Sequence, residues 1–121
     1  MIIKCKTAEA AMNRAYPFVY LGFFLLTPQL AAAEVPTVDL VIREHKFVPE
    51  TLEVPAGVKF KLIVKNEDTT AEEFESYELN REKVVAPNSQ AIIYVGPLDP
   101  GTYPFFGDFN QKTARGHMVA K

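Results

Sequence analysis

The sequence predicts an all-β domain built as a Greek-key antiparallel β-sandwich. Short segments that are apolar, or that alternate between apolar and polar residues, recur along residues 38–121 and are separated by turn-forming residues. The chain has 121 residues, which is enough for one such domain. Several short strands with Pro/Gly turns between them are typical of antiparallel sandwiches.

Seven strands are expected from these patterns, and residues 58–64 give the clearest one. Its apolar residues at 58, 60 and 62 alternate with Lys59 and Lys61, so one face of the strand is apolar and the other is basic. The full set covers residues 38–42, 47–49, 51–54, 58–64, 91–95, 102–106 and 116–120. Residues 71–85 are the one stretch in which a helical turn is considered.

Residues 1–33 are expected to be a secretory signal peptide rather than part of this domain. Arg14 supplies a positive charge before an apolar run at residues 15–26, and the alanines at 31–33 fit the small-residue cleavage pattern. We therefore expect cleavage before Glu34 and a soluble domain at residues 34–121. A retained N-terminal anchor is the alternative.

The only cysteine, Cys5, falls inside this leader and also precedes Met12, which is a more ordinary start than Met1. The expected domain therefore has no thiol for a disulfide or a thiolate metal site. Residues 34–121 carry 10 Lys and Arg against 14 Asp and Glu, a net charge of −4. This balance argues against nucleic acid as a partner, because nucleic acid requires a basic face, and it suits a cation or a basic partner.

The order and spacing of four motifs resemble the cupredoxin superfamily. The motifs are FVPETLEVPAGVKFKLIVKNEDTTAEEFES at residues 47–76, LNREKVV at 79–85, GPLDPGTYPFFGDF at 96–109 and a closing Gly-x-x-Val-x-Lys at 116–121. More closely, they resemble the EfeO-type cupredoxin-like domain of bacterial periplasmic iron-uptake proteins, including the stand-alone, FtrB-like cupredoxin component of ferrous-iron transport systems. The resemblance covers residues 38–121 and implies a cupredoxin-like sandwich in the periplasm.

The resemblance also implies a metal position at one end of the sandwich, where cupredoxins bind copper through two histidines, a cysteine and a methionine. By position, the first histidine falls on Glu72, the cysteine on Gly107 and the second histidine on Asn110. The methionine falls near Thr113, where the loop is one residue longer. A blue-copper centre depends on a thiolate and two imidazoles, so none is expected here.

Oxygen donors and one imidazole are the candidate metal ligands at this end. They are His45, Glu72, Asp108 and Glu75. On an extended strand Glu72 shares a face with Phe74, while Glu73 and Glu75 point the other way. If Phe74 is buried, Glu72 faces the implied metal position, and Glu75 lies on a different face or beyond a bend. For His45, an exposed loop position is an equal alternative.

Two neighbouring features have plainer explanations. His117 alternates with Met118 in the last expected strand, so we expect Met118 in the core and His117 as an ordinary strand residue. The acidic run at residues 72–82 is accompanied by Arg81 and Lys83, so a solvated face with internal salt bridges is the default explanation for its remaining carboxylates.

Carboxylates with one histidine form a hard-donor site, which suits iron or Cu(II) better than Cu(I). Three functions follow as hypotheses. The first is a periplasmic accessory protein of iron uptake that binds iron or copper and assists iron oxidation or passes iron to an inner-membrane permease, with a periplasmic iron-binding protein as a further partner. The second is a metal-free interaction module, and the third is an electron-transfer protein. Hydrolytic and nucleotide chemistry are not expected, because the sequence has no Ser-His-Asp, Cys-His or phosphate-loop arrangement.

Overall fold

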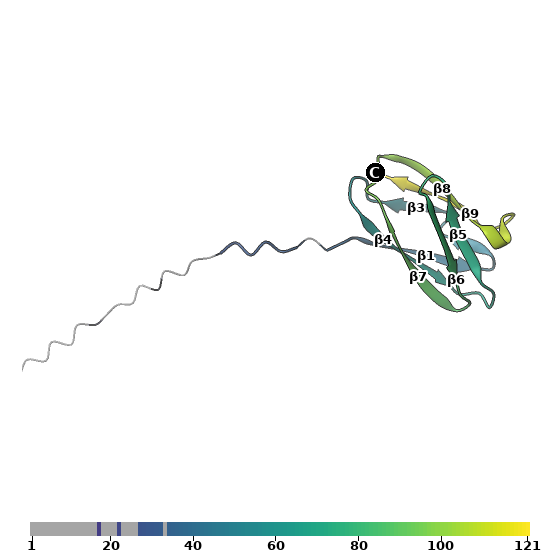
Figure 1. Cartoon of the computed structure of the whole chain (residues 1–121), viewed down its shortest axis with the longest axis horizontal. Coiled ribbons are helices and arrows are strands. Elements are labelled where there is room, and N and C mark those ends of the chain that lie inside the picture. The colour runs from purple at the N-terminus through teal and green to yellow at the C-terminus, as the bar shows by residue number, and fades with distance from the viewer. Residues whose placement is uncertain (1–16, 18–21, 23–26, 33) are drawn as a thin grey trace, which may run out of the picture. The chain divides into compact units, whose positions relative to one another are not determined.

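The computed structural model describes residues 17, 22, 27–32 and 34–121 (Figure 1). Most of the expected leader, including Cys5, Met12 and the apolar run at residues 15–26, therefore lies outside the described residues. Ala32–Lys121 forms one compact unit. Among the described residues, no helix is both long enough and apolar enough to cross a membrane.

Nine strands and one short 3-10 helix make up the described part of this domain. In chain order they are β1 (Thr37–Arg43), β2 (Lys46–Val48), β3 (Thr51–Val54), β4 (Phe60–Asn66), β5 (Glu72–Ser76), β6 (Arg81–Val85), β7 (Ser89–Val95), β8 (Gly101–Gly107), η1 (Asp108–Asn110) and β9 (Arg115–Ala120). Each of the seven expected strands overlaps one of these elements.

The strands form two sheets, which pack against each other as the two layers seen in Figure 1. One sheet has the order β2-β1-β4-β7 and the other has the order β3-β9-β8-β5-β6. The predicted all-β sandwich is confirmed. The pairings of β1 with β4 and of β3 with β9 are parallel, whereas the sequence was expected to give antiparallel neighbours. They arise because the chain crosses from the first sheet to the second between β2 and β3.

Residues 71–85 contain an antiparallel hairpin of β5 and β6, and not the helical turn that was considered. Burial alternates along β5, with Phe74 and Ser76 buried and Glu73 and Glu75 facing outward. This period of two suits a strand, whereas an amphipathic helix would need apolar residues three or four positions apart.

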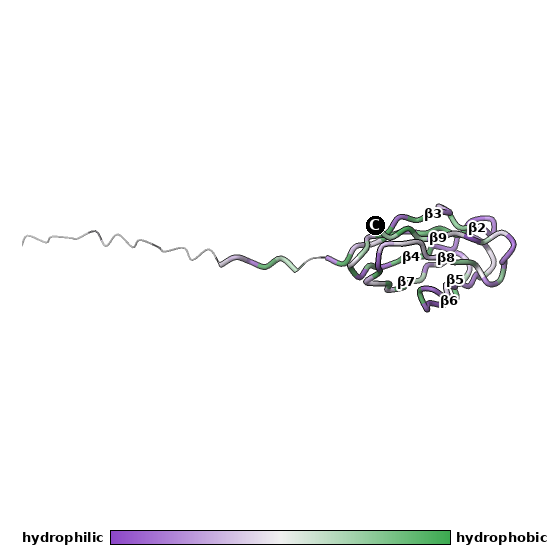
Figure 2. The backbone as a smooth tube through the Cα atoms, turned by 90° about the horizontal axis from the view of Figure 1, so that it is seen from above, coloured by the Kyte–Doolittle hydropathy of each residue, from purple (hydrophilic) through white to green (hydrophobic). Residues whose placement is uncertain are grey.

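Three phenylalanine rings lie at the centre of the core between the sheets. Phe47 packs edge-on against Phe105 with a centroid distance of 5.0 Å, and Phe74 lies 5.3 Å from Phe105. Met118 is also fully buried, as expected from its alternation with His117. Figure 2 shows hydrophobic stretches mainly within the strands and hydrophilic ones mainly in the connections. The core thus holds the two sheets together and positions the loops that connect the strands at each end of the sandwich.

Candidate functional site

Glu72, the first residue of β5, points into the end of the sandwich and is only 1% exposed. Its Oε1 atom accepts hydrogen bonds from the backbone N–H groups of Phe109, at 2.9 Å, and Glu73, at 3.0 Å. Its Oε2 atom accepts a hydrogen bond from the side-chain amide of Asn110 at 2.6 Å. A carboxylate can be buried only where other donors replace water, and these three donors do so.

Gly107, the last residue of β8, leaves the space that the Glu72 carboxylate fills. A Cβ atom at Gly107 would lie 2.6 Å from Glu72 Cδ and 2.7 Å from the Cβ atom of Ala114. Residues 72, 107 and 110 therefore meet, as the resemblance implied, but a carboxylate and an amide occupy the meeting point. These positions supply no thiolate and no imidazole, so they do not fit a type 1 copper ion.

A second group of carboxylates lies on the outward face of β5 and at the start of η1. We call Glu73, Glu75 and Asp108 the acidic cluster, because one oxygen from each lies within 4.8 Å of the others. Glu75 also stands opposite Glu82 in the β5–β6 register. In the part of the chain that the structure describes, none of the ion pairs involves the acidic cluster or Glu82. Their negative charges therefore lie together without a paired base.

This crowding shifts the titration of two members of the acidic cluster. The pKa of Glu73 is raised above its ordinary value by desolvation, by a side-chain hydrogen bond with Glu82, and by the charges of Glu82, Asp108 and Glu75. The pKa of Glu75 is raised by desolvation and by the charges of Asp108 and Glu82. Desolvation is the largest cause for both groups, and the like charges of the neighbouring carboxylates add to it because they oppose ionisation.

Substitution of Glu75 by glutamine is expected to raise the midpoint of thermal unfolding at pH 7 in the absence of metal, and to change it little at pH 4. A carboxyl group whose pKa rises on folding holds its proton more tightly in the folded state. Its stabilising contribution is therefore present below the unfolded value of 4.5 and is lost as the pH rises through the folded value. Thermal unfolding followed by circular dichroism at both pH values measures this difference.

Glu53→Gln is the matched control, because Glu53 is exposed and already lies 2.7 Å from the Lys121 ammonium. It removes the same charge from a place where that charge has a basic partner, so it is not expected to raise the midpoint at pH 7. An equal rise for Glu75→Gln at both pH values would show that repulsion between carboxylates is not the cause.

His45 lies at the tip of the β1–β2 hairpin. Glu44 and His45 have φ values of 52° and 58°, the left-handed conformation found in tight two-residue hairpin turns. The Asp68 carboxylate holds this tip, because it accepts hydrogen bonds from the backbone N–H groups of Glu44, at 2.7 Å, and His45, at 3.0 Å. The His45 Nδ1 atom lies 3.7 Å from Asp68 Oδ2, and about half of the side chain is exposed.

His45 and Asp108 line the same pocket, which has a volume of about 500 Å³ and is completed by residues 109–113. The structure thus divides the four predicted ligands among three settings. Glu72 lies buried beneath η1, Glu75 and Asp108 belong to the acidic cluster, and His45 lines the same pocket as Asp108. Asp108 is the member that links the last two settings. Metal binding by these residues stays a prediction.

Glu73 is the member of the acidic cluster that the sequence did not single out. The β5–β8 register pairs Glu75 with Phe106 and Phe74 with Gly107, which brings Asp108, the residue directly after β8, beside Glu73. The outward alternation of Glu73 and Glu75 was visible in the sequence, but this cross-strand register was not.

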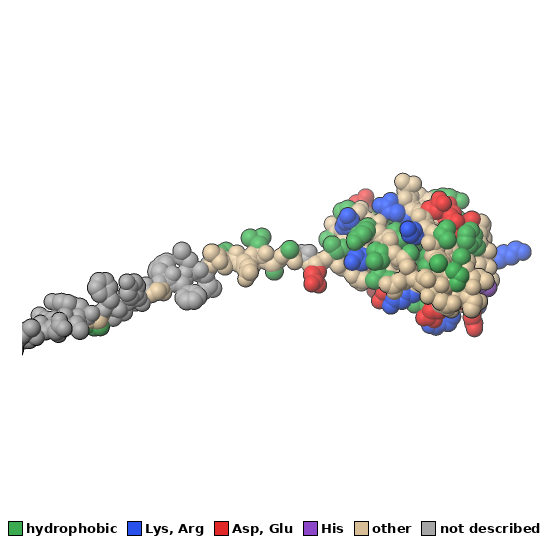
Figure 3. Space-filling model, turned by 60° about the horizontal axis from the view of Figure 1, so that its bottom comes forward, with side chains coloured by type: hydrophobic (Ala, Val, Ile, Leu, Met, Phe, Trp, Pro, Cys, Tyr) green, Lys and Arg blue, Asp and Glu red, His purple; other side chains and the backbone are tan. Residues whose placement is uncertain are grey.

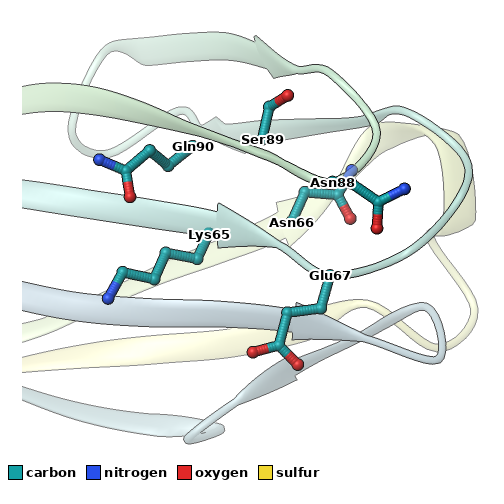
Figure 4. Close-up of a pocket in the computed structure, with 6 residues that line it drawn as sticks. All are labelled: Lys65, Asn66, Glu67, Asn88, Ser89 and Gln90. Carbon is teal, nitrogen blue, oxygen red and sulfur yellow. The ribbon is translucent and has the colours of Figure 1, made fainter.

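A further pocket of about 370 Å³ lies where β4 ends and β7 begins (Figure 4). In Figure 4 the side chains of Lys65 and Gln90 run in the same direction, away from Asn88. The only carboxylate that lines this pocket is Glu67, which already pairs with Arg43 at 2.8 Å. The pocket therefore offers no cation site comparable to the acidic cluster.

Comparisons with known proteins agree with this fold. The chain matches the sequence model of the cupredoxin-like domain over residues 17–120. It is 50% identical over 82 residues to an uncharacterized protein of Rickettsia prowazekii (strain Madrid E), and the match covers 68% of this chain and 66% of that relative.

Solved structures with the same fold include copper proteins of low sequence identity. Auracyanin A of Chloroflexus aurantiacus, described as a "blue" copper protein, gives a TM-score of 0.58 at 14% identity, over 73% of this chain and 100% of its own. Amicyanin of Paracoccus versutus gives a TM-score of 0.53 at 13% identity, over 75% of this chain and 85% of its own. Such identities establish a shared fold and nothing about bound metal. By its sequence match and its two-sheet architecture, the chain belongs to the cupredoxin-like domain family.

Proposed function

We propose that this chain is a metal-binding accessory protein of bacterial iron uptake, and that it binds iron or copper through the acidic cluster. The observation that supports the proposal is the approach of the Glu73, Glu75 and Asp108 oxygens to within 4.8 Å, with no basic side chain paired to them in the described part of the chain. A cation among these oxygens would relieve their mutual repulsion.

The chemistry of the donors favours a hard ion. Carboxylate oxygens suit Fe(III), Fe(II), Mn(II) or Cu(II) better than Cu(I). They also favour ferric over ferrous iron, because the higher charge gains more from anionic oxygens. This preference supports a role in assisting iron oxidation, and the imidazole of His45, which lines the same pocket as Asp108, offers a nitrogen donor.

The proposed position of the ion differs from the position that the family resemblance implies. Glu72 already accepts three hydrogen bonds at that inherited position, so the proposal transfers the metal-binding role to the outward face of β5. An ion bound on this outward face would be accessible to a second protein. A periplasmic location, an inner-membrane iron permease and a periplasmic iron-binding protein complete the proposal on the strength of the motifs that resemble iron-uptake proteins.

Calorimetric titration with Fe(II) under anaerobic conditions, Fe(III), Cu(II) and Mn(II) tests the proposal. We expect the wild-type chain to bind at least one of these ions, and the variant Glu75→Gln/Asp108→Asn to bind it about tenfold or more weakly. The control Glu53→Gln/Asp99→Asn removes the same two charges from exposed positions outside the acidic cluster and should bind like the wild type. The rate of ferrous oxidation with and without Cu(II) then measures whether the bound ion is redox-active.

A metal-free interaction module is the second candidate function, and one observation favours it. The Glu72 carboxylate and the Asn110 amide close the inherited metal position without an ion. Absence of binding to every ion in the titration, or equal binding by both double variants, would leave this second function in place of the first.

A further inference from the structure

The outer face of the β2-β1-β4-β7 sheet carries an apolar row that no other described element covers. In the β4–β7 register, Lys61 stands opposite Tyr94 and Ile63 stands opposite Ile92. Ile92 and Tyr94 are each 47% exposed, although their neighbours on the inner face of the sheet fill the core. Two large apolar side chains thus lie side by side in solvent on an edge strand.

Lysines surround this apolar row. The ammonium groups of Lys59 and Lys61 lie 5.0 and 5.9 Å from the centre of the Tyr94 ring. Lys65 lies farther along β4, and its ammonium is 3.8 Å from the carboxylate of Asp39. We call Lys59, Lys61, Lys65, Ile92 and Tyr94 the lysine–tyrosine face. Figure 3 shows basic and hydrophobic side chains side by side at the end of the domain where β1 begins.

The local charge of this face opposes that of the domain as a whole. Residues 34–121 carry a net charge of −4, yet among the ion pairs of the described residues only one lysine of the lysine–tyrosine face, Lys65, pairs with a carboxylate, that of Asp39. The carboxylates of the acidic cluster belong to β5 and η1, in the region of the other sheet. A partner of this face is therefore expected to be anionic, and also to accept apolar side chains.

The chain joins the domain at the same place. β1 begins opposite Lys61, and the Lys61 N–H donates a hydrogen bond to the carbonyl of Pro36 at 2.8 Å. Only residues 27–36 separate this point from the apolar run at residues 15–26, a span of about 35 Å at most when fully extended. If the leader is retained as an N-terminal anchor, the alternative to cleavage before Glu34, the membrane that holds it is within reach of the lysine–tyrosine face.

We propose that the lysine–tyrosine face binds the surface of an anionic phospholipid bilayer. Lysine stems lie along apolar surface while their ammonium groups reach phosphates, and the tyrosine ring suits the boundary between headgroups and acyl chains. A symmetric pairing of two copies through this face is disfavoured, because it would bring lysines against lysines. The proposal is independent of the metal-binding function.

The absence of tryptophan from the chain permits a direct optical test. Tyr94→Trp places a single tryptophan on the lysine–tyrosine face, where the ring keeps its lysine neighbours. Tyr77→Trp is the matched control, because Tyr77 is 74% exposed and lies at the end of β5 in the other sheet. We expect vesicles of phosphatidylcholine and phosphatidylglycerol to shift the emission of Trp at 94 to shorter wavelength and to leave Trp at 77 unchanged. Vesicles of phosphatidylcholine alone should change neither.

Charge removal then tests the lysines. In the full chain carrying Tyr94→Trp, the change Lys59→Gln/Lys61→Gln/Lys65→Gln should weaken binding to anionic vesicles by about fivefold for each lysine. Lys83→Gln/Lys112→Gln/Lys121→Gln removes the same charge from other positions and should bind like the parent.

Three outcomes would overturn the proposal. They are equal emission shifts at positions 94 and 77, equal binding by the two triple variants, and a response of Trp at 94 to soluble polyglutamate but not to anionic vesicles. The last would assign the face to an acidic protein instead.

Discussion

Glu72→Ala is expected to lower the free energy of unfolding by about 3 kcal/mol, the largest stability change among the charged residues of the domain. The substitution removes the acceptor for the Phe109 N–H, the Glu73 N–H and the Asn110 amide, and it leaves these three donors without their partner in the protein. It also empties the space in front of Gly107. Urea denaturation followed by far-ultraviolet circular dichroism measures the change.

Two variants separate the hydrogen bonds from the volume of the side chain. Glu72→Gln keeps the size and one acceptor oxygen, so we expect it to cost less than Glu72→Ala. Glu73→Ala removes a neighbouring glutamate that faces outward, and it should not destabilise the domain by a comparable amount. A cost for Glu73→Ala as large as that for Glu72→Ala would contradict the structural role assigned to the buried carboxylate.

The triple variant Glu72→His/Gly107→Cys/Asn110→His is expected to turn a colourless domain into one that absorbs visible light strongly on addition of Cu(II). These three residues meet in the structure, since the Glu72 Oε2 atom lies 2.6 Å from Asn110 Nδ2 and a Cβ at Gly107 would touch Glu72 Cδ. Removal of the Glu72 carboxylate clears the contacts of a cysteine Cβ with that side chain, and the remaining contact, 2.7 Å from the Cβ atom of Ala114, requires a small shift of the loop between η1 and β9. Two imidazoles and a thiolate are then the equatorial ligands of a blue-copper site.

The absorption spectrum during a Cu(II) titration measures this outcome. Glu72→His/Asn110→His, which lacks the thiolate, is the control and should stay without the intense band, because that band arises from charge transfer between thiolate sulfur and copper. A folded triple variant that binds Cu(II) without the band would show that residues 72, 107 and 110 do not present their side chains to one point.

Most strands were predictable, because their signals are local. Residues 58–64 alternate between apolar and basic residues, and β4 at Phe60–Asn66 follows that pattern after a turn. The hairpin of β5 and β6 was less visible, because β6 has four exposed residues and only Val85 is buried. An edge strand with a single buried residue has almost no alternation of apolar and polar residues that would reveal it in the sequence.

Only part of the candidate site was predictable. Its side-chain directions follow from local alternation, whereas its contacts join residues that are far apart in the sequence. The outward and inward directions of Glu73 and Glu72 followed from strand alternation alone. The hydrogen-bond partners of Glu72 could not be predicted in this way, because Phe109 and Asn110 are 37 and 38 residues away in the sequence. The acidic cluster likewise depends on the β5–β8 register, which no local pattern specifies.

Closure of the end of the sandwich by Glu72 and Asn110 has a consequence for biogenesis. Metalloproteins whose loops are tied together by an ion gain part of their folding free energy from it, so their maturation depends on supply of that ion. Here side chains of the polypeptide itself satisfy one another at that place. The domain is therefore expected to reach its folded state without a supply of metal ion.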